Sequence, residues 1–100
     1  MSVAETIRDQ LPRGFGAMIG VKNLIGLDNG LDIRFKARAK NGINRIVITL
    51  NALDLYDVSY ERVTNGKAGF KQTIKATSEG LYNDMLKTDI ETTTELYLSL

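Results

Sequence analysis

The sequence predicts an α+β fold in which an antiparallel meander of five to six strands has an N-terminal and a C-terminal helix packed on one face. Apolar residues recur every three or four positions near both ends of the chain, which indicates amphipathic helices. Between these segments, apolar and polar residues alternate in runs separated by Asn-Gly and Asp-Asn-Gly, which is typical of strands joined by tight turns. At 100 residues and 43% hydrophobic content, residues 1–100 are expected to form one domain.

The first helix is predicted at the N-terminus, where Ser2 followed by Glu5 forms a capping-box pattern. Val3, Ile7 and Leu11 recur every four residues and give the helix one apolar stripe. The Pro-Arg-Gly sequence that follows is expected to end the helix. A helix this short needs packing against the rest of the domain to persist.

The first two strands are predicted over residues 15–27 and 31–39, with apolar side chains on the odd positions of both. A two-residue Asn-Gly loop between them would set Ile25 opposite Arg34. A three-residue Asp-Asn-Gly loop, with its Gly left-handed, would set Ile25 opposite Ile33. We predict the three-residue loop, because a register slip of one residue would turn the apolar set toward water.

The third predicted strand is expected to turn Ile46 toward the core, and the fourth is expected to turn Tyr56 and Tyr60 toward it. The Thr-Asn-Gly sequence at 64–66 repeats the turn chemistry of the first hairpin. The same three-residue loop sets Tyr60 opposite Phe70 on the fifth strand, and such an aromatic pair contributes roughly 0.2–1 kcal/mol.

The second helix is predicted to be capped by Thr77 or Ser78 and to carry an apolar stripe over 81–90. Three consecutive threonines at 92–94 are weak helix formers, so the helix is expected to fray there. Apolar and polar residues then alternate over 96–100, which predicts a short sixth strand.

The absence of Cys and His from the chain excludes several kinds of chemistry. Thiolate and Ser-His nucleophiles, disulfides and Cys- or His-based metal centres cannot form within it. Asp57 and Glu61 share a predicted strand face about 13 Å apart, at ~3.3 Å per residue, which is too far for a paired acid and base. We expect these carboxylates to pair across the hairpin with Lys71 and Lys75. The sequence therefore predicts no enzyme, with no catalytic residue, no metal site and no cofactor.

The location of the protein is inferred from what its sequence lacks. The N-terminal sequence has neither the basic region nor the apolar stretch of a signal peptide. Every apolar run is much shorter than the ~20 residues of a membrane span. We therefore expect a cytoplasmic protein with no membrane partner.

A row of basic residues at a spacing of two is the first candidate site: Arg34, Lys36, Arg38 and Lys40. On one strand this row would be about 20 Å long, at ~3.3 Å per residue. In the predicted register it lies beside Gly20, Lys22 and Gly26, which favours a shallow basic groove suited to backbone phosphates. An ordinary solvated strand face, whose charges protect an edge from aggregation, is the alternative.

The C-terminal tail is the second candidate site and consists of Leu96, Tyr97, Leu98 and Leu100. An exposed tail would be an apolar strand that docks on another protein or on a second copy of the chain, giving a homodimer. Packing of these side chains against the domain itself is the alternative.

Several segments together resemble a set of small proteins encoded by tailed phages and prophages. They are Gly20-Val21-Lys22-Asn23, Ile48-Thr49-Leu50-Asn51, Asp54-Leu55-Tyr56-Asp57-Val58, Tyr82-Asn83-Asp84-Met85-Leu86 and Leu96-Tyr97-Leu98-Ser99-Leu100. The resemblance implies a phage context and a location in the host cytoplasm, and it transfers no functional residue. A virion component, a replication accessory and a host-directed inhibitor all fit this context.

Two hypotheses about function follow. The first is a non-enzymatic, phage-type accessory or interaction protein that acts by protein–protein contact or self-association. The alternative is a nucleic-acid-binding module that uses the basic strand face. Phosphate binding predicts an affinity that falls steeply with salt, whereas a protein contact predicts sensitivity to truncation of residues 96–100.

Overall fold

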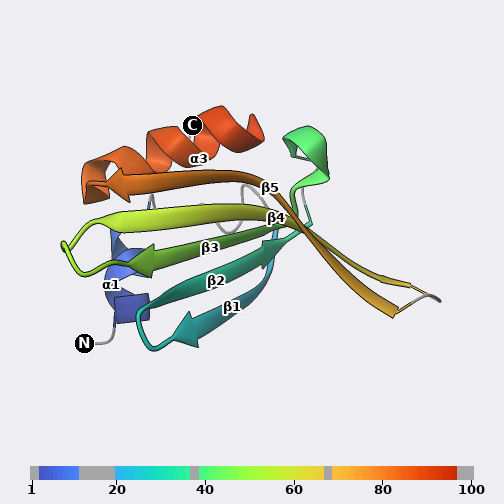
Figure 1. The fold of residues 1–100 in the computed structure, drawn as a ribbon, viewed down its shortest axis with the longest axis horizontal. Coiled ribbons are helices and arrows are strands. Elements are labelled where there is room, and N and C mark those ends of the chain that lie inside the picture. The colour runs from blue at the N-terminus through green and yellow to red at the C-terminus, as the bar shows by residue number, and fades with distance from the viewer. Residues whose placement is uncertain (1–2, 12–19, 37–38, 67–68, 97–100) are drawn as a thin grey trace.

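The computed structural model describes residues 3–11, 20–36, 39–66 and 69–96. Its strands pair antiparallel in chain order, as the five-stranded meander β1-β2-β3-β4-β5. This is the α+β arrangement predicted from the sequence, with one helix before the sheet and one after it (Figure 1). The elements are α1 (Val3–Gln10), β1 (Val21–Leu27), β2 (Gly30–Phe35), η1 (Lys40–Gly42), β3 (Arg45–Leu50), β4 (Tyr56–Gly66), β5 (Gly69–Leu81), η2 (Asn83–Met85) and α3 (Leu86–Thr94).

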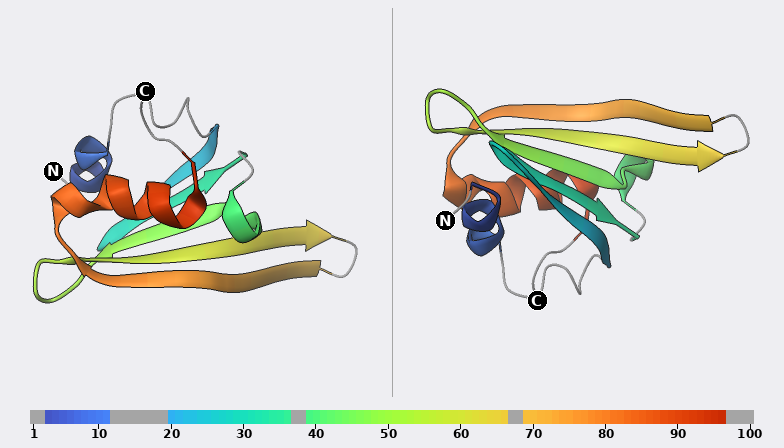
Figure 2. Two further views of the ribbon diagram at one scale, coloured as in Figure 1. Left: turned by 90° about the horizontal axis from the view of Figure 1, so that it is seen from above. Right: turned by 90° about the horizontal axis from the view of Figure 1, so that it is seen from below.

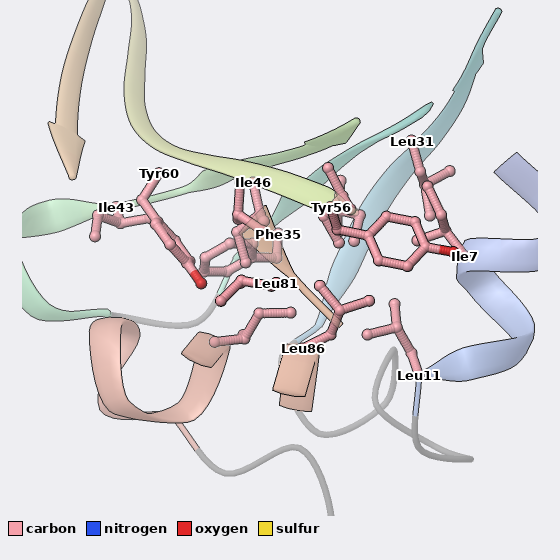
Figure 3. Close-up of a cluster of buried hydrophobic side chains, with 14 residues drawn as sticks. Ile7, Leu11, Leu31, Phe35, Ile43, Ile46, Tyr56, Tyr60, Leu81 and Leu86 are labelled. Atoms are coloured by element: carbon pink, nitrogen blue, oxygen red, sulfur yellow. The ribbon is translucent and has the colours of Figure 1, made fainter. Parts of the chain in front are cut away.

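Both helices cover the same face of the sheet, and the core lies between them and the strands (Figure 2). Helix α1 contributes Ile7, and Leu11 directly after the helix is also buried, as the predicted apolar stripe requires. Helix α3 contributes Leu86 and Ile90. Figure 3 shows Ile7, Leu11 and Leu86 in one cluster with the buried side chains of the strands. The buried apolar residues of the strands are Leu31, Ile33, Phe35, Ile46, Ile48, Tyr56, Val58, Tyr60 and Leu81.

Helix α3 is joined to the sheet by a half-buried carboxylate as well as by apolar packing. The Tyr60 hydroxyl of β4 donates a hydrogen bond to Asp89, and the Ser78 hydroxyl of β5 donates to the same carboxylate at 2.9 Å. Burial, together with the hydrogen bond to Asp89, raises the pKa of the Tyr60 hydroxyl above its ordinary value. Tyr60 is therefore held protonated, as a donor that positions α3.

The β4–β5 hairpin is longer than the rest of the sheet and projects beyond it (Figures 1 and 2). Glu61 is the last β4 residue that pairs with β3, and its β5 partner is Ile74. We call residues 62–66 and 69–73 the arm, and the other described residues the body. At the base of the arm, the Asn44 side chain donates to the Val63 carbonyl and accepts from the Val63 amide, both at 2.8 Å.

The predicted register of the first hairpin is wrong. Leu27 pairs with Gly30, so Ile25 lies opposite Asp32 and not opposite Ile33. The prediction made Gly30 a left-handed turn residue, but it is the first residue of β2, where a Cβ would lie 2.1 Å from the Ile48 carbonyl oxygen. The glycine is needed for close approach to β3, and the apolar side chain of Ile25 is left half-exposed on the outer face.

The predicted register of the second hairpin is also wrong. Strand β4 continues through 64–66, where the turn was expected, and β5 begins at Gly69, which has a φ of 100°. Tyr60 therefore pairs with Ala76, whereas Phe70 pairs with Asn65 in the arm. A bulge between Tyr60 and Glu61 shifts the pairing by one further residue. The small Ala76 side chain is the neighbour that the Tyr60 ring meets at the core.

The second helix begins later and ends later than predicted. Residues 77–81 belong to β5, and the helix starts at Leu86 after the short turn η2. The threonines at 92–94 do not fray. Thr94 is buried, its hydroxyl donates to the Ile90 carbonyl at 2.6 Å, and the Leu96 amide donates to that hydroxyl at 3.2 Å. The expected sixth strand falls on residues 97–100, which lie outside the described residues.

Candidate functional site

The face of the sheet opposite the helices carries a buried network of charges. Asp32 of β2 and Glu61 of β4 are only 3% and 5% exposed. Arg45 of β3 lies between them and donates to both Asp32 carboxylate oxygens at 3.0 and 2.8 Å, and to Glu61 at 2.9 Å. The Ser59 hydroxyl and the Gln72 amide also donate to Glu61, at 2.8 and 2.5 Å. Both carboxylates are thereby ion-paired with the same guanidinium and hydrogen-bonded within the sheet.

This network corrects the prediction that the carboxylates pair with Lys71 and Lys75. Glu61 is instead paired with Arg45, because cross-strand pairing aligns Arg45 with Glu61. Asp57 accepts hydrogen bonds from the Asn51 amide at 3.2 Å and from the Gly80 backbone at 3.0 Å. The hydrogen bond to Asp32 raises the pKa of Arg45 although burial opposes it, so this guanidinium stays charged.

Arg34 lies next to this network but is only loosely tied to it. It pairs directly across the strands with Arg45, which places two like charges side by side. One Arg34 nitrogen lies 3.8 Å from Asp32, which is an ion-pair distance but not a hydrogen bond. Its Nε is buried and has no hydrogen-bond partner among the described residues. Arg34 therefore has donor capacity that the network does not use.

Two adjoining hollows lie at one end of the body. They are bordered by the start of β1, by the segment between β2 and η1, and by the base of the arm. The larger is about 610 Å³ in volume and the smaller about 260 Å³, and they share Lys22, Phe35 and Asn44. We call them together the basic cleft, after the cations that line them: Lys22, Arg34, Lys36 and Arg62. None of the described residues that line the cleft is acidic.

The fold positions these cations separately. The Lys36 amide donates to the Gly20 carbonyl at 2.9 Å, which joins the end of β2 to the residue before β1. Arg62 donates to the Gly42 carbonyl at 2.9 Å, and a Cβ at Gly42 would lie 2.8 Å from the Arg62 guanidinium. Within the described part of the chain, Lys22 and Lys36 have no ion pair. Their ammonium groups face solvent at the cleft.

The predicted basic row is only partly present in this cleft. Strand β2 ends at Phe35, so the expectation of one straight row along a strand is wrong. Arg34 and Lys36 line the cleft, whereas Lys40 belongs to η1 and lies 3.7 Å from Glu95. Arg38 lies outside the described residues.

Lys22 was predicted to lie beside the row, whereas Arg62 was not among the predicted site residues. Arg62 was not predicted because the fourth strand was expected to turn at 64–66, which would have placed this residue near the end of a hairpin. A usable signal was present in the sequence. The segment 62–78 contains Arg62, Lys67, Lys71 and Lys75 and neither Asp nor Glu. An acid-free segment that forms a projecting hairpin gives a positive potential along its length.

The C-terminal candidate site is described at one position. Leu96 is half-buried and packs against the core. Tyr97, Leu98 and Leu100 lie outside the described residues, so an interface at the tail stays a prediction. The described helices include none that is long and apolar enough to cross a membrane. No cluster of His, Cys, Asp and Glu suited to a metal ion occurs among the described residues.

Comparisons with known proteins do not place the chain in a family. No family model, no curated protein and no solved structure matches it. The resemblance to small phage proteins therefore stays a prediction.

Proposed function

We propose that the protein is a non-enzymatic binding module that holds the phosphate backbone of a nucleic acid in the basic cleft. The observation that carries this proposal is the convergence of Lys22, Arg34, Lys36 and Arg62 on one cleft with no acidic residue among its described lining. Ammonium and guanidinium groups form strong, charge-assisted hydrogen bonds to phosphate oxygens. Several such groups along one cleft match a chain of phosphates better than a single anion.

The unequal pairing of the cations supports the same conclusion. Arg45 bridges Asp32 and Glu61, and Arg34, 3.8 Å from Asp32, supplies the second positive charge that balances the two carboxylates. Lys22 and Lys36 have no ion pair among the described residues, and the Arg34 side chain is 35% exposed at the smaller hollow. The molecule thus separates one structural guanidinium from the cations that face a hollow.

The hypothesis of protein contact or self-association stays second. Three of the four residues on which it depends lie outside the described part of the chain, and Leu96 packs against the core. We further propose that the binding takes place in the cytoplasm, and in that of the host if the protein is encoded by a phage. Light scattering across a concentration series tests self-association separately.

The decisive experiment is fluorescence anisotropy with a labelled mixed-sequence oligonucleotide, single-stranded and duplex, from about 50 to 200 mM salt. Four phosphate contacts predict a log–log slope of about −3 on single strands and about −3.6 on duplex. The double variant Lys36→Gln/Arg62→Gln should reduce the magnitude of the slope by about 1.4 on single strands.

The matched control is Arg8→Gln/Lys87→Gln, which removes the same net charge. Arg8 is on α1, and Lys87 is near the start of α3, at the end of the body opposite the arm (Figure 1). This control should keep the wild-type slope. Binding that is absent at low salt, or equally weakened by both double variants, would contradict the proposal.

A further inference from the structure

We propose that the nucleic acid is single-stranded and that Phe70 of the arm stacks on one of its bases. This inference rests on the proposed function and adds the class of nucleic acid and the residue that selects it. Proteins that bind single strands combine a basic groove for the backbone with aromatic side chains for the bases. The basic cleft supplies the first part, and the arm supplies an aromatic ring beside it.

The register of the hairpin places Phe70 at the outer end of the cleft. Val63 and Asn65 both line the smaller hollow, together with Arg34. Phe70 pairs directly with Asn65, and directly opposed residues of an antiparallel pair have their side chains on the same face. The ring therefore lies on the face of the arm that adjoins the hollow.

Phe70 is 60% exposed, although its side chain is one of the largest apolar groups in the protein. Phe35, which also lines the cleft, is buried in the core and cannot present a face. Because the bases of a duplex already stack on each other, only a single strand offers a free base to an exposed ring without unstacking. The exposed ring thus favours single strands over duplex.

Two amide side chains complete the arrangement. Asn23 and Asn65 line the smaller hollow, and their side chains have no hydrogen-bond partner among the described residues. Asn44 lines it as well, but its amide is occupied by the Val63 backbone. Carboxamides suit the polar edges of unstacked bases, so Asn23 and Asn65 are placed to contact bases while the cations contact phosphates.

The first test compares four labelled oligonucleotides of about 15 nucleotides: oligo-dT, oligo-U, a duplex, and an abasic strand that keeps every phosphate. We expect oligo-dT or oligo-U to bind about tenfold more tightly than the abasic strand. Phe70→Ala should remove this difference and leave binding to the abasic strand unchanged. The comparison of oligo-dT with oligo-U shows whether DNA or RNA is preferred, and either preference supports the inference.

The control variant is Ile74→Ala. Ile74 is 61% exposed and is the β5 partner of Glu61. Its substitution by alanine therefore removes exposed apolar area but no aromatic ring. We expect this variant to bind oligo-dT as the wild type does. An equal loss in the two variants would mean that apolar area, and not stacking, carries the effect, and it would overturn the inference.

A second measurement uses the absence of Trp from the chain. Phe70→Trp places a single tryptophan at the proposed stacking position, and it can be excited selectively over the four tyrosines. We expect oligo-dT to quench this tryptophan while the abasic strand does not. Leu53→Trp is the control, because Leu53 is exposed in the loop between β3 and β4, at the opposite end of the sheet (Figure 1). Its fluorescence should not change with either strand.

The two proposals fail in different ways. Salt-dependent binding in which the abasic strand or the duplex equals oligo-dT, and in which Phe70→Ala is neutral, overturns stacking but leaves the phosphate cleft intact. Absence of binding to all four oligonucleotides at low salt overturns the proposed function and the inference together.

Discussion

The two halves of strand β4 differ sharply although they belong to one continuous strand. Tyr56, Val58 and Tyr60 in the body are buried under the helices, whereas the side chains of the arm are exposed or half-buried. The difference arises at the first residue of β3, Arg45, because beyond its partner Glu61 the β4 strand keeps β5 as a neighbour but no longer has β3. Burial in this sheet therefore depends on which strands continue alongside. The body supplies stability, and the arm and its base supply exposed charge and an exposed ring.

The largest expected effect tests whether guanidinium groups have different roles in body and arm. Arg45→Met leaves Asp32 and Glu61 buried without their cation, which should lower the free energy of unfolding by about 3–5 kcal/mol. Arg62→Met removes an exposed guanidinium whose partner is one carbonyl, which should cost less than about 1 kcal/mol. Urea unfolding midpoints measure both.

The companion variant Arg45→Met/Asp32→Asn/Glu61→Gln sharpens this comparison. Because it also removes the unpaired charges, it should recover part of the stability lost by Arg45→Met alone. Equal losses in the Arg45 and Arg62 variants would mean that the buried network does not distinguish the body from the arm.

The next effect compares a glycine of the body with a glycine of the arm. A Cβ at Gly30 would meet the Ile48 carbonyl oxygen at 2.1 Å, so Gly30→Ala should destabilise the fold by about 3 kcal/mol. At Gly66 the same Cβ meets no described atom within 4 Å, so Gly66→Ala should change stability by less than about 0.5 kcal/mol. Thermal or urea unfolding separates the two. A tolerated Gly30→Ala would contradict the close approach of β2 to β3.

A smaller effect concerns the contact between β4 and α3. Tyr60→Phe removes the donor to Asp89 and should cost about 1–2 kcal/mol at neutral pH. Because the pKa of Tyr60 is raised on folding, its contribution is present below about pH 10 and is lost as the pH rises above that value. When the pH is raised from below 10 to above 10, the free energy of unfolding should therefore decrease more in the wild type than in the Tyr60→Phe variant. Tyr82→Phe, at an exposed tyrosine, should keep the wild-type slope.

The spacing of apolar residues, together with the composition, was sufficient to predict the order of the helices and strands and most of the core residues. Ile7, Ile46 and Tyr60 are buried as predicted, because alternation and four-residue spacing report which face of an element is apolar. The two registers were not predictable in the same way. Each depended on one glycine-containing sequence, and glycine serves a turn and a close approach equally well. Gly30 fills the second role, and the turn expected at 64–66 is replaced by continuing strand.

The candidate site was predictable only for those of its residues that are close to one another in the sequence. Arg34 and Lys36 were identified because they are close in sequence, and both line the cleft. Arg62 lines the cleft and Phe70 pairs with Asn65 of its lining, so the positions of both depend on the hairpin register, which was predicted wrongly. The expected pairing of Phe70 with Tyr60 would have put the ring near the core. The shift in the hairpin register therefore decides whether the Phe70 ring lies near the core or is exposed on the arm.

The smallest effect on stability tests whether the charge of the arm takes part in binding. Lys71 lies in the arm and Lys75 at its base, and both are exposed, so Lys71→Gln/Lys75→Gln should change the unfolding free energy by less than about 0.5 kcal/mol. If each ammonium group contacts a phosphate, the log–log salt slope on single strands should fall in magnitude by about 1.4. Lys71→Arg/Lys75→Arg keeps both charges and should keep the slope. An unchanged slope in the Gln variant would confine phosphate binding to the cleft, and the acid-free arm would then carry Phe70 without contributing electrostatic attraction of its own.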